Sequence, residues 1–199
     1  MKELSLNILD IAMNSVKAEA TRIDIEIRET EDELEFSVTD NGFGMSEEMI
    51  RNVTDPFCTT RKTRKVGLGI PFLRLAAEQT GGGISITSRE RAKFPNDCGT
   101  RTSAKFYKKH IDYTPLGDII STVCTLIQGS PDIDFTFTHT GPGFSVYLST
   151  AEMRETLGPD VPLSSVEVIA WTMIKPEQSA PLVRLVPPHT YGLPMNWVA

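Results

Sequence analysis

The sequence lacks paired cysteines, long apolar runs and an excess of positive charge. Its 199 residues include three widely separated cysteines, with no CxxC pair and no secretory leader, so we expect a reduced, cytoplasmic location. No run approaches the roughly 20 apolar residues that span a bilayer. Because 26 acidic residues outnumber 20 basic ones, the net charge of -6 favours neither nucleic acid nor anionic membrane as a partner.

Two common nucleotide-binding signatures are also missing. No GxxxxGK[ST] loop occurs, and the GxG pair at residues 67–69 lacks the third glycine of the dinucleotide fingerprint. The P-loop and Rossmann folds are therefore not indicated, and any nucleotide site in this chain has to be built in another way.

Hydrophobic periodicity predicts an α/β two-layer sandwich with helices on one face of a mixed sheet, within residues 1–108. A small α/β accessory module (109–176) and a proline-rich tail (177–199) are expected to follow. The predicted helices are 3–19, 46–53, one that begins near Gly69 and ends at the glycines 81–83, 115–128, 150–158 and 163–175. The predicted strands are 21–28, 33–39, 84–88, 100–107 and a hairpin within 133–150.

Polar residues form a stripe along the first predicted helix. Asn7, Asp10, Asn14 and Lys17 recur at steps of three and four, so they share one helix face, and the last three carry the chemistry. They offer, in order, a base, a metal-ligand oxygen and a cation, and this set suits a triphosphate carrying Mg²⁺. The alternative is that these side chains only cap or bridge neighbouring backbone.

Two glycine pairs mark places where something can lie close to the backbone. In "DNGFGM", Asp40 ends a strand as a hydrogen-bond acceptor, and Gly42 and Gly44 leave room for a flat ring. A simple turn explains one of these glycines well and the pair less well. Gly67 and Gly69 precede a helix, where free backbone amides form an anion site suited to phosphates.

Taken together, these segments resemble the GHKL superfamily, which groups gyrase, heat-shock chaperones, histidine kinases and mismatch-repair ATPases. The resemblance covers residues 3 to about 107 and implies the left-handed α/β ATP-binding fold, also called the Bergerat fold. "DIAMNSVKAEATRIDIEI" is similar to the N-box, "DNGFGM" to the G1 box, and "DPFCTTRK" with "GLGI" to the ATP lid and G2 box. The Gly-Thr pair at 99–100 is similar to the G3 element.

The resemblance implies a role for each matching residue, with ATP and Mg²⁺ as cofactors. Asn14 would hold Mg²⁺, and Asp40 would accept a hydrogen bond from the adenine amino group, above a floor made by Gly42 and Gly44. Lys17 is similar to a lysine of the kinases. The remaining ATP-binding positions are Thr59, Thr60 and Arg61 near the phosphates, Gly67, Leu68 and Gly69 against them, and Thr100.

Asp10 bears on the reaction. In the hydrolytic members and the related serine kinases, the residue one turn before the magnesium asparagine is a glutamate that acts as general base, and in histidine kinases it is commonly an amide. Asp10 keeps the carboxylate, which favours base chemistry, but its side chain is one methylene shorter than glutamate. A purely structural role for Asp10 is the alternative.

We therefore expect an ATP-binding regulatory or signalling protein that transfers phosphate to a separate protein. None of its three histidines has the acidic neighbour typical of a phosphoacceptor, so we expect the acceptor on a partner. One alternative is an ATPase whose lid closure drives homodimer formation or changes a partner. A nucleotide-sensing module without turnover is another. The basic run within 61–65 needs no nucleic acid to explain it, because it lies in a loop expected to meet a triphosphate.

Overall fold

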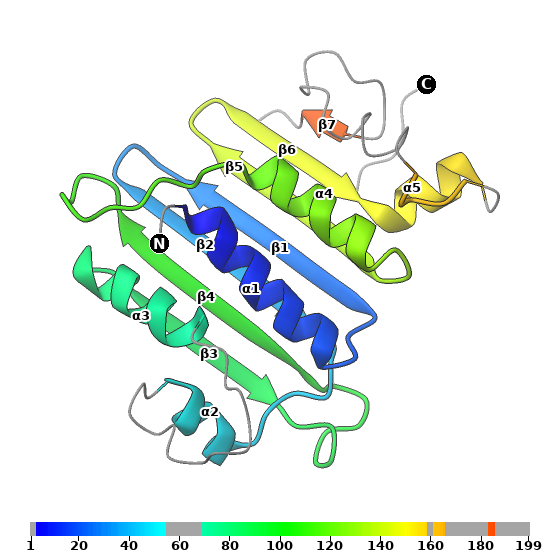
Figure 1. Ribbon diagram of the computed structural model, residues 1–199, viewed down its shortest axis with the longest axis horizontal. Coiled ribbons are helices and arrows are strands. Elements are labelled where there is room, and N and C mark those ends of the chain that lie inside the picture. The colour runs from blue at the N-terminus through cyan, green and yellow to red at the C-terminus, as the bar shows by residue number, and fades with distance from the viewer. Residues whose placement is uncertain (1–2, 55–68, 159–160, 166–182, 186–199) are drawn as a thin grey trace.

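One mixed sheet organises the computed structural model, which describes residues 3–54, 69–158, 161–165 and 183–185 (Figure 1). Its strand order is β3-β4-β2-β1-β5-β6-β7. β1 and β5 pair in parallel, and the other neighbours are antiparallel. The strands are β1 Arg22–Glu29, β2 Glu33–Asp40, β3 Gly83–Arg89, β4 Gly99–Tyr107, β5 Asp134–Gly141, β6 Phe144–Ser149 and β7 Val183–Leu185.

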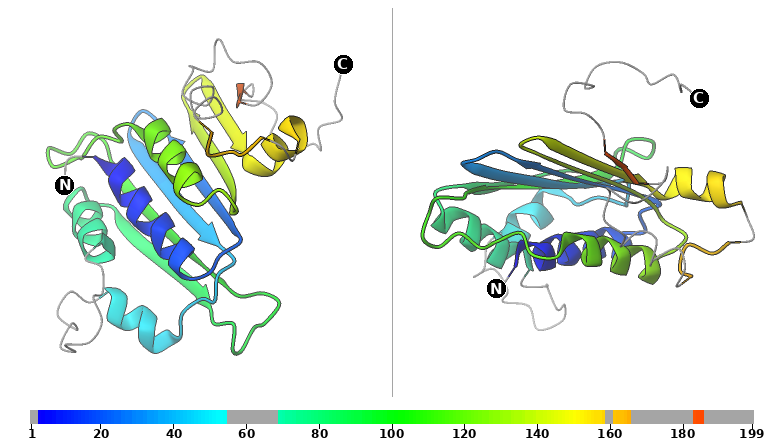
Figure 2. Two further views of the ribbon diagram at one scale, coloured as in Figure 1. Left: turned by 45° about the vertical axis from the view of Figure 1, so that its right-hand side comes forward. Right: turned by 90° about the horizontal axis from the view of Figure 1, so that it is seen from above.

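Helices cover one face of this sheet, as the view from above in Figure 2 shows. α1 lies across the middle strands, with α3 on one side of it and α4 on the other (Figure 1). α2 lies beside α3 near the end of β3, and α5 lies at the opposite edge of the sheet. The helices are α1 Leu4–Lys17, α2 Glu47–Thr54, α3 Gly69–Gln79, α4 Ile119–Gly129 and α5 Thr150–Leu157. This arrangement confirms the predicted fold class.

Alternation along the strands explains why only one face is covered. In β1, Ile23, Ile25 and Ile27 are buried, while Asp24 and Glu26 between them point to the other face and stay partly exposed. Successive side chains of a strand point to opposite faces, so each strand contributes an apolar row to the core and a polar row to solvent. β2 repeats the pattern, and the two rows meet α1.

The sheet continues across the boundary predicted at residue 108. β5 pairs with β1 from Arg22 opposite Asp134 to Arg28 opposite Thr140. Phe135 and Phe137 of β5 belong to the same buried cluster as the isoleucines of β1. The segment expected to form an accessory module thus extends the sheet and the core of the first 108 residues. The division at 108 stays a prediction that coincides with no break in either.

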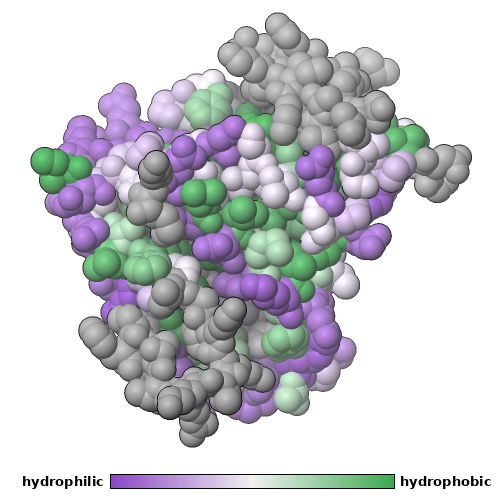
Figure 3. All heavy atoms as spheres, in the orientation of Figure 1, coloured by the Kyte–Doolittle hydropathy of each residue, from purple (hydrophilic) through white to green (hydrophobic). Residues whose placement is uncertain are grey.

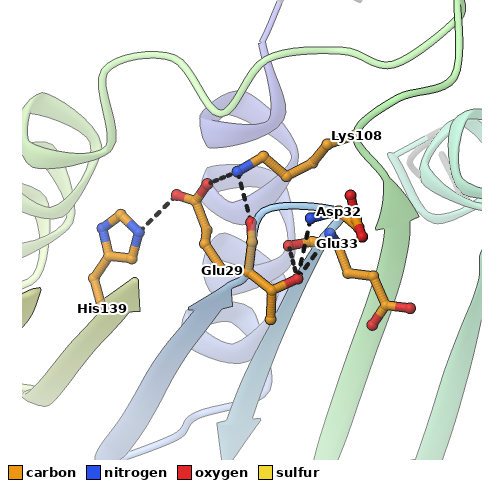
Figure 4. Close-up of polar contacts among 6 residues, drawn as sticks. Glu29, Asp32, Glu33, Lys108 and His139 are labelled. Atoms are coloured by element: carbon orange, nitrogen blue, oxygen red, sulfur yellow. Dashed lines mark hydrogen bonds and ion pairs between the residues drawn. The ribbon is translucent and has the colours of Figure 1, made fainter. Parts of the chain in front are cut away.

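A partly buried ionic cluster links three strands at the end of the sheet away from Asp40 (Figure 4). The Glu29 carboxylate accepts from Lys108 Nζ and hydrogen-bonds to His139 Nε2, each at 2.8 Å. Burial of Glu29 opposes its ionisation, but the hydrogen bonds from Lys108 and His139 outweigh burial, so the pKa of this carboxyl is lowered. His139 thus helps join β5 to β1.

The helix predicted at 115–128 begins later, at Ile119. The carbonyl oxygens of Pro115 and Leu116 accept hydrogen bonds from the first backbone amides of α1, Leu4 N at 2.9 Å and Ser5 N at 2.8 Å. These residues therefore cap α1 and do not start α4. Asp118 caps α4 itself, because its Oδ1 accepts from Ser121 N at 2.9 Å.

The other predicted elements in the described ranges are present. Ser46 caps α2, because its Oγ accepts from Met49 N at 3.2 Å. Of the helix predicted at 163–175, residues 163–165 form a turn and the rest lies outside the described residues, as does most of the tail. Figure 3 shows apolar residues interrupting the polar surface over the helix layer. The exposed large hydrophobic residues of α1 and α3 are Leu6, Met13, Phe72 and Leu75.

Candidate functional site

The candidate site is a pocket of about 230 Å³ where β2 ends beneath the last turns of α1. Five of the predicted site residues line this pocket: Asn14, Lys17, Asp40, Gly44 and Thr100. They come from α1, β2, the turn after β2 and β4, so the fold gathers residues up to 86 positions apart in the chain, from Asn14 to Thr100. A pocket with a few convergent polar groups is the usual form of a small-molecule site.

Asp40 is held in place by three donors. Its Oδ1 accepts from the backbone amides of Gly42 at 2.9 Å and Thr100 at 3.2 Å. Its Oδ2 accepts from the Ser15 hydroxyl at 2.6 Å. A carboxylate oxygen can accept two hydrogen bonds, so Oδ2 keeps one acceptor position for a ligand. These bonds hold the carboxylate in one orientation at the pocket.

Gly42 and Gly44 are required by the chain's own close approach. A Cβ at Gly42 would lie 2.6 Å from the Ala18 carbonyl oxygen, and one at Gly44 would overlap the Arg89 carbonyl oxygen. Gly44 also has φ +67°, which favours glycine. The Cβ position at each of these glycines is therefore filled by the chain's own backbone, and only Gly44 of the two lines the pocket. Their contact with adenine stays a prediction.

Asp10 lies just outside the lining of the pocket, against the start of α3. A Cβ at Gly69 would lie 3.2 Å from Asp10 Oδ2 and 3.3 Å from Asp10 Cβ, so the side chain and the first residue of α3 are in direct proximity. Asp10 and Asn14 are both exposed on the same flank of α1. The structure therefore brings together the predicted base, the predicted magnesium ligand and one predicted phosphate-loop glycine.

Thr100 also connects the pocket to β3. Its hydroxyl lies 2.9 Å from Ser88 Oγ, which in turn donates to the Gly99 carbonyl oxygen at 2.9 Å and accepts from Met45 N at 2.7 Å. This chain of bonds connects the turn after β2 to the ends of β3 and β4. It fixes the position of the backbone on which Asp40 and Gly44 sit.

Apolar walls of the pocket were not predicted. They come from α1, the turn after β2, the face of α2 that carries Met49 and Val53, and the first turn of α3. The spacing of four between Met49 and Val53 was the available signal, because it puts both side chains on one face of a short helix. Ser15 was also missed as a site residue. The apolar lining residues include Ile11, Phe43, Met45, Met49, Val53 and Ile70.

Five predicted site residues lie outside the described residues: Thr59, Thr60, Arg61, Gly67 and Leu68. The basic run within 61–65 and its expected loop lie there too. Their roles in an ATP lid and a phosphate loop stay predictions.

The donor set fits Mg²⁺ bound together with phosphates better than a protein-only metal site. In the described part of the chain, no group of three or more His, Cys, Asp or Glu side chains could hold a metal ion. Asn14 offers one exposed amide oxygen at the pocket, with the Asp10 carboxylate one turn away. Mg²⁺ commonly takes one or two protein oxygens and completes its shell with phosphate and water, and this arrangement could supply that number.

Fold and pocket together define the chain as a two-layer α/β domain with a small-molecule pocket. The sequence profile described as histidine kinase-, DNA gyrase B-, and HSP90-like ATPase matches residues 1–110, and the chain belongs to this family. This result confirms the resemblance to the GHKL superfamily.

Similar proteins include sensor kinases. The chain is 27% identical over 113 residues to an NtrY-like sensor histidine kinase of Rickettsia conorii, covering 56% of this chain and 18% of that protein. It is 32% identical over 82 residues to the tetrathionate sensor histidine kinase TtrS of Salmonella typhimurium, covering 41% and 14%. The chain thus spans less than a fifth of the length of these relatives.

A solved structure shares the fold across most of the chain. The ATPase domain of MutL from Aquifex aeolicus, complexed with ADP, matches with a TM-score of 0.50 and 10% sequence identity, covering 86% of this chain and 87% of that one. At this identity the match shows the fold alone. In the described ranges, no helix is both long and apolar enough to cross a membrane.

Proposed function

We propose that this protein binds ATP with Mg²⁺ and acts as a regulatory module that transfers the terminal phosphoryl group to a separate protein. The observation that carries the proposal is the Asp40 carboxylate, held by three donors with one acceptor position left at an apolar pocket. Family membership supports the same function, and the relatives named as sensor histidine kinases favour signalling.

Adenine is the ligand group that suits this pocket. Its amino group would donate to Asp40 Oδ2, and its flat apolar faces would pack against side chains such as Met49 and Ile70. The Ser15 hydroxyl, buried and bonded to the same oxygen, would keep the carboxylate facing the base. Guanine carries a carbonyl oxygen where adenine has its amino group, so an acceptor at Asp40 would disfavour it.

The phosphates would then extend toward the flank of α1 that carries Asn14 and Asp10. Asn14 would supply an oxygen ligand to Mg²⁺, which would neutralise phosphate charge when bound, and Lys17 would add a cation at the pocket. Asp10 would accept the proton of the attacking hydroxyl or water. Because its carboxylate lies close to the start of α3, it is also placed to sense how closely that helix approaches α1.

A phosphoacceptor on a partner fits the positions of the described histidines. His139 lies in β5 and bonds to Glu29, at the end of the sheet opposite Asp40, since β1 pairs Ile23 with Asp40 and Glu29 with Leu34. His110 lies in the exposed segment after β4, at that same far end. Neither reaches the pocket in this structure, which supports transfer to another protein.

A second candidate function is ATP hydrolysis coupled to dimer formation or to a change in a partner. The Asp10 carboxylate favours it, because a carboxylate can activate water where the amide common in histidine kinases cannot. A cytoplasmic location and a purely nucleotide-sensing role remain further hypotheses.

Radiolabel transfer and phosphate release separate these candidates. The purified protein is incubated with Mg²⁺ and ATP labelled at the γ-phosphate, with and without candidate partners, beside an Asp10→Asn variant whose ATP binding is checked. Label that appears on a partner only when this protein is present supports the kinase. Steady phosphate release that Asp10→Asn abolishes supports the ATPase, and binding without either reaction supports the sensor.

A further inference from the structure

Asn7 of α1 is a buried polar side chain without a hydrogen-bond partner. The residue is 2% exposed, and neither Nδ2 nor Oδ1 of its amide is bonded within the described part of the chain. Ser15, on the same helix and 3% exposed, is bonded to Asp40. Buried amides are normally paired because leaving them dry is costly, so an unpaired one calls for a physical explanation.

Asn7 lies on the side of α1 that faces α3. It precedes Asp10 by three residues, so it projects roughly 60° around the helix axis from Asp10, toward the buried side. Asp10 lies close to Gly69 at the start of α3, because a Cβ at Gly69 would be 3.2 Å from Asp10 Oδ2, and α1 and α3 lie side by side (Figure 1). The unpaired amide therefore lies on the flank of α1 that α3 covers.

The buried surface of α3 offers this amide no partner. The buried residues of α3 are Ile70, Leu73 and Ala77, and none has a polar side-chain atom. Backbone groups in the middle of α3 are occupied by the helix's own hydrogen bonds. In this packing the amide can gain partners only if α3 shifts along or away from α1, which would admit water or bring a free backbone group within reach.

We propose that α3 packs on α1 in two arrangements: the observed one, in which the Asn7 amide is unpaired, and a second one, in which the amide is paired. Nucleotide binding favours the second arrangement. The inference rests on the proposed nucleotide site. Ile70 provides the connection, since it belongs to the first turn of α3 and also lines the pocket. A ligand that contacts Ile70 and the phosphate-facing start of α3 binds the two arrangements with different affinity, and such a difference shifts the population.

Apolar replacements of Asn7 test the proposal. Asn7→Leu and Asn7→Met remove the unpaired amide and keep a helix-forming side chain of similar length. Thr122→Val serves as the matched control, because Thr122 is a buried polar residue of α4 that does not line the pocket, and its hydroxyl bonds to the Asp118 carbonyl oxygen. The three variants are compared with the wild type by thermal unfolding, by hydrogen exchange of the α3 amides and by ATP titration calorimetry.

The expected pattern is specific to α3. Without nucleotide, both Asn7 variants should unfold roughly 2 to 6 °C higher than the wild type and slow exchange of the α3 amides about tenfold. Their ATP affinity should fall about tenfold, because the second arrangement becomes less accessible. Thr122→Val should leave α3 exchange and ATP affinity unchanged.

Three outcomes would overturn the inference. A lower unfolding temperature in both Asn7 variants would mean that water already pairs the amide. Unchanged ATP affinity with a raised unfolding temperature would mean that the unpaired amide is a defect unconnected to the site. Failure of the wild type to bind ATP would overturn the proposed function and the coupling with it, and it is recognisable separately because the exchange comparison uses no nucleotide.

Discussion

Replacing Asp40 with asparagine tests the pocket most selectively, because it exchanges one carboxylate oxygen for an NH₂ group and changes the shape little. Gly42 N and Thr100 N both donate to one carboxylate oxygen, so the asparagine would turn its carbonyl oxygen toward these amides. Its NH₂ group would then occupy the position of Oδ2. Ser15 can rotate its hydroxyl to accept from this NH₂ group, but an adenine amino group would meet a second donor and lose its partner.

The expected loss follows from that mismatch. A hydrogen bond to a charged group contributes about 1.5 to 3 kcal/mol, and a ligand donor left unpaired in the pocket adds about 1 to 3 kcal/mol. The sum, about 2.5 to 6 kcal/mol, corresponds to an affinity loss of roughly 70-fold or more. The fold should survive, because the two backbone amides keep an acceptor.

Titration calorimetry with ATP measures this effect, and Asp24→Asn is the control. Asp24→Asn is the same substitution on the neighbouring strand. Asp24 lies opposite Thr39, on the face of the sheet away from the helices. ATP affinity should drop in the first variant and stay unchanged in the control. An Asp40→Asn protein that is folded and binds ATP within threefold of the wild type would refute the placement of adenine at this carboxylate.

Three further substitutions follow from the same contacts. Ser15→Ala should weaken ATP binding about tenfold in a titration, since the adenine-facing carboxylate loses one of its donors; unchanged affinity would remove its positioning role. Gly44→Ala should lower stability to urea by about 2 kcal/mol or more, because φ is +67° and the new Cβ meets the Arg89 carbonyl oxygen; an unchanged midpoint would contradict that packing. Glu29→Gln should flatten the acid limb of the stability curve. The pKa of Glu29 is lowered on folding, so its carboxylate stabilises the fold fully at pH values above 4.5, the pKa of an unperturbed glutamate. This stabilisation is lost as the pH falls below that value. Equal pH dependence of the wild type and the variant in urea titrations at pH 3 to 7 would contradict the lowered pKa.

Alternation along the strands was enough to predict the sheet, but not its order. The isoleucines of β1 and the apolar row of β2 are local patterns, and the short turn between the strands makes their pairing local as well. The parallel pairing of β1 with β5 joins residues more than a hundred positions apart, and no local pattern encodes it. For this reason residues 109–176 were predicted as a separate module although they extend the same sheet.

The backbone contacts that require glycine at positions 42 and 44 could not be predicted from the sequence. Gly42 and Gly44 suggested room for a flat ring, but their Cβ positions are blocked by the backbone of Ala18 and Arg89. Those contacts depend on how the end of α1 and the end of β3 meet the turn, which the local sequence does not reveal. Asp40 was easier to single out, because it ends a strand as a hydrogen-bond acceptor and matches the carboxylate of the G1 box.

Ser15 could have been found from the sequence. It lies next to Asn14 but one step further around the helix, on the side that carries Ile8 and Ile11, so its hydroxyl was bound to be buried. A buried hydroxyl needs a partner, and Asp40 was the nearest candidate at a strand end. Asn7 is likewise a buried polar residue of α1, but it has no partner among the described residues. Only the packing of α3 shows this.

The central claim is that the Asp40 pocket binds ATP with Mg²⁺. A calorimetric titration of the wild-type protein with ATP, in the presence of Mg²⁺ and again with the metal chelated, tests it most directly. We predict saturable binding of one ATP per chain that weakens when Mg²⁺ is removed and is lost in Asp40→Asn. Absence of saturable binding at millimolar ATP with Mg²⁺, in a protein shown to be folded, would contradict the claim.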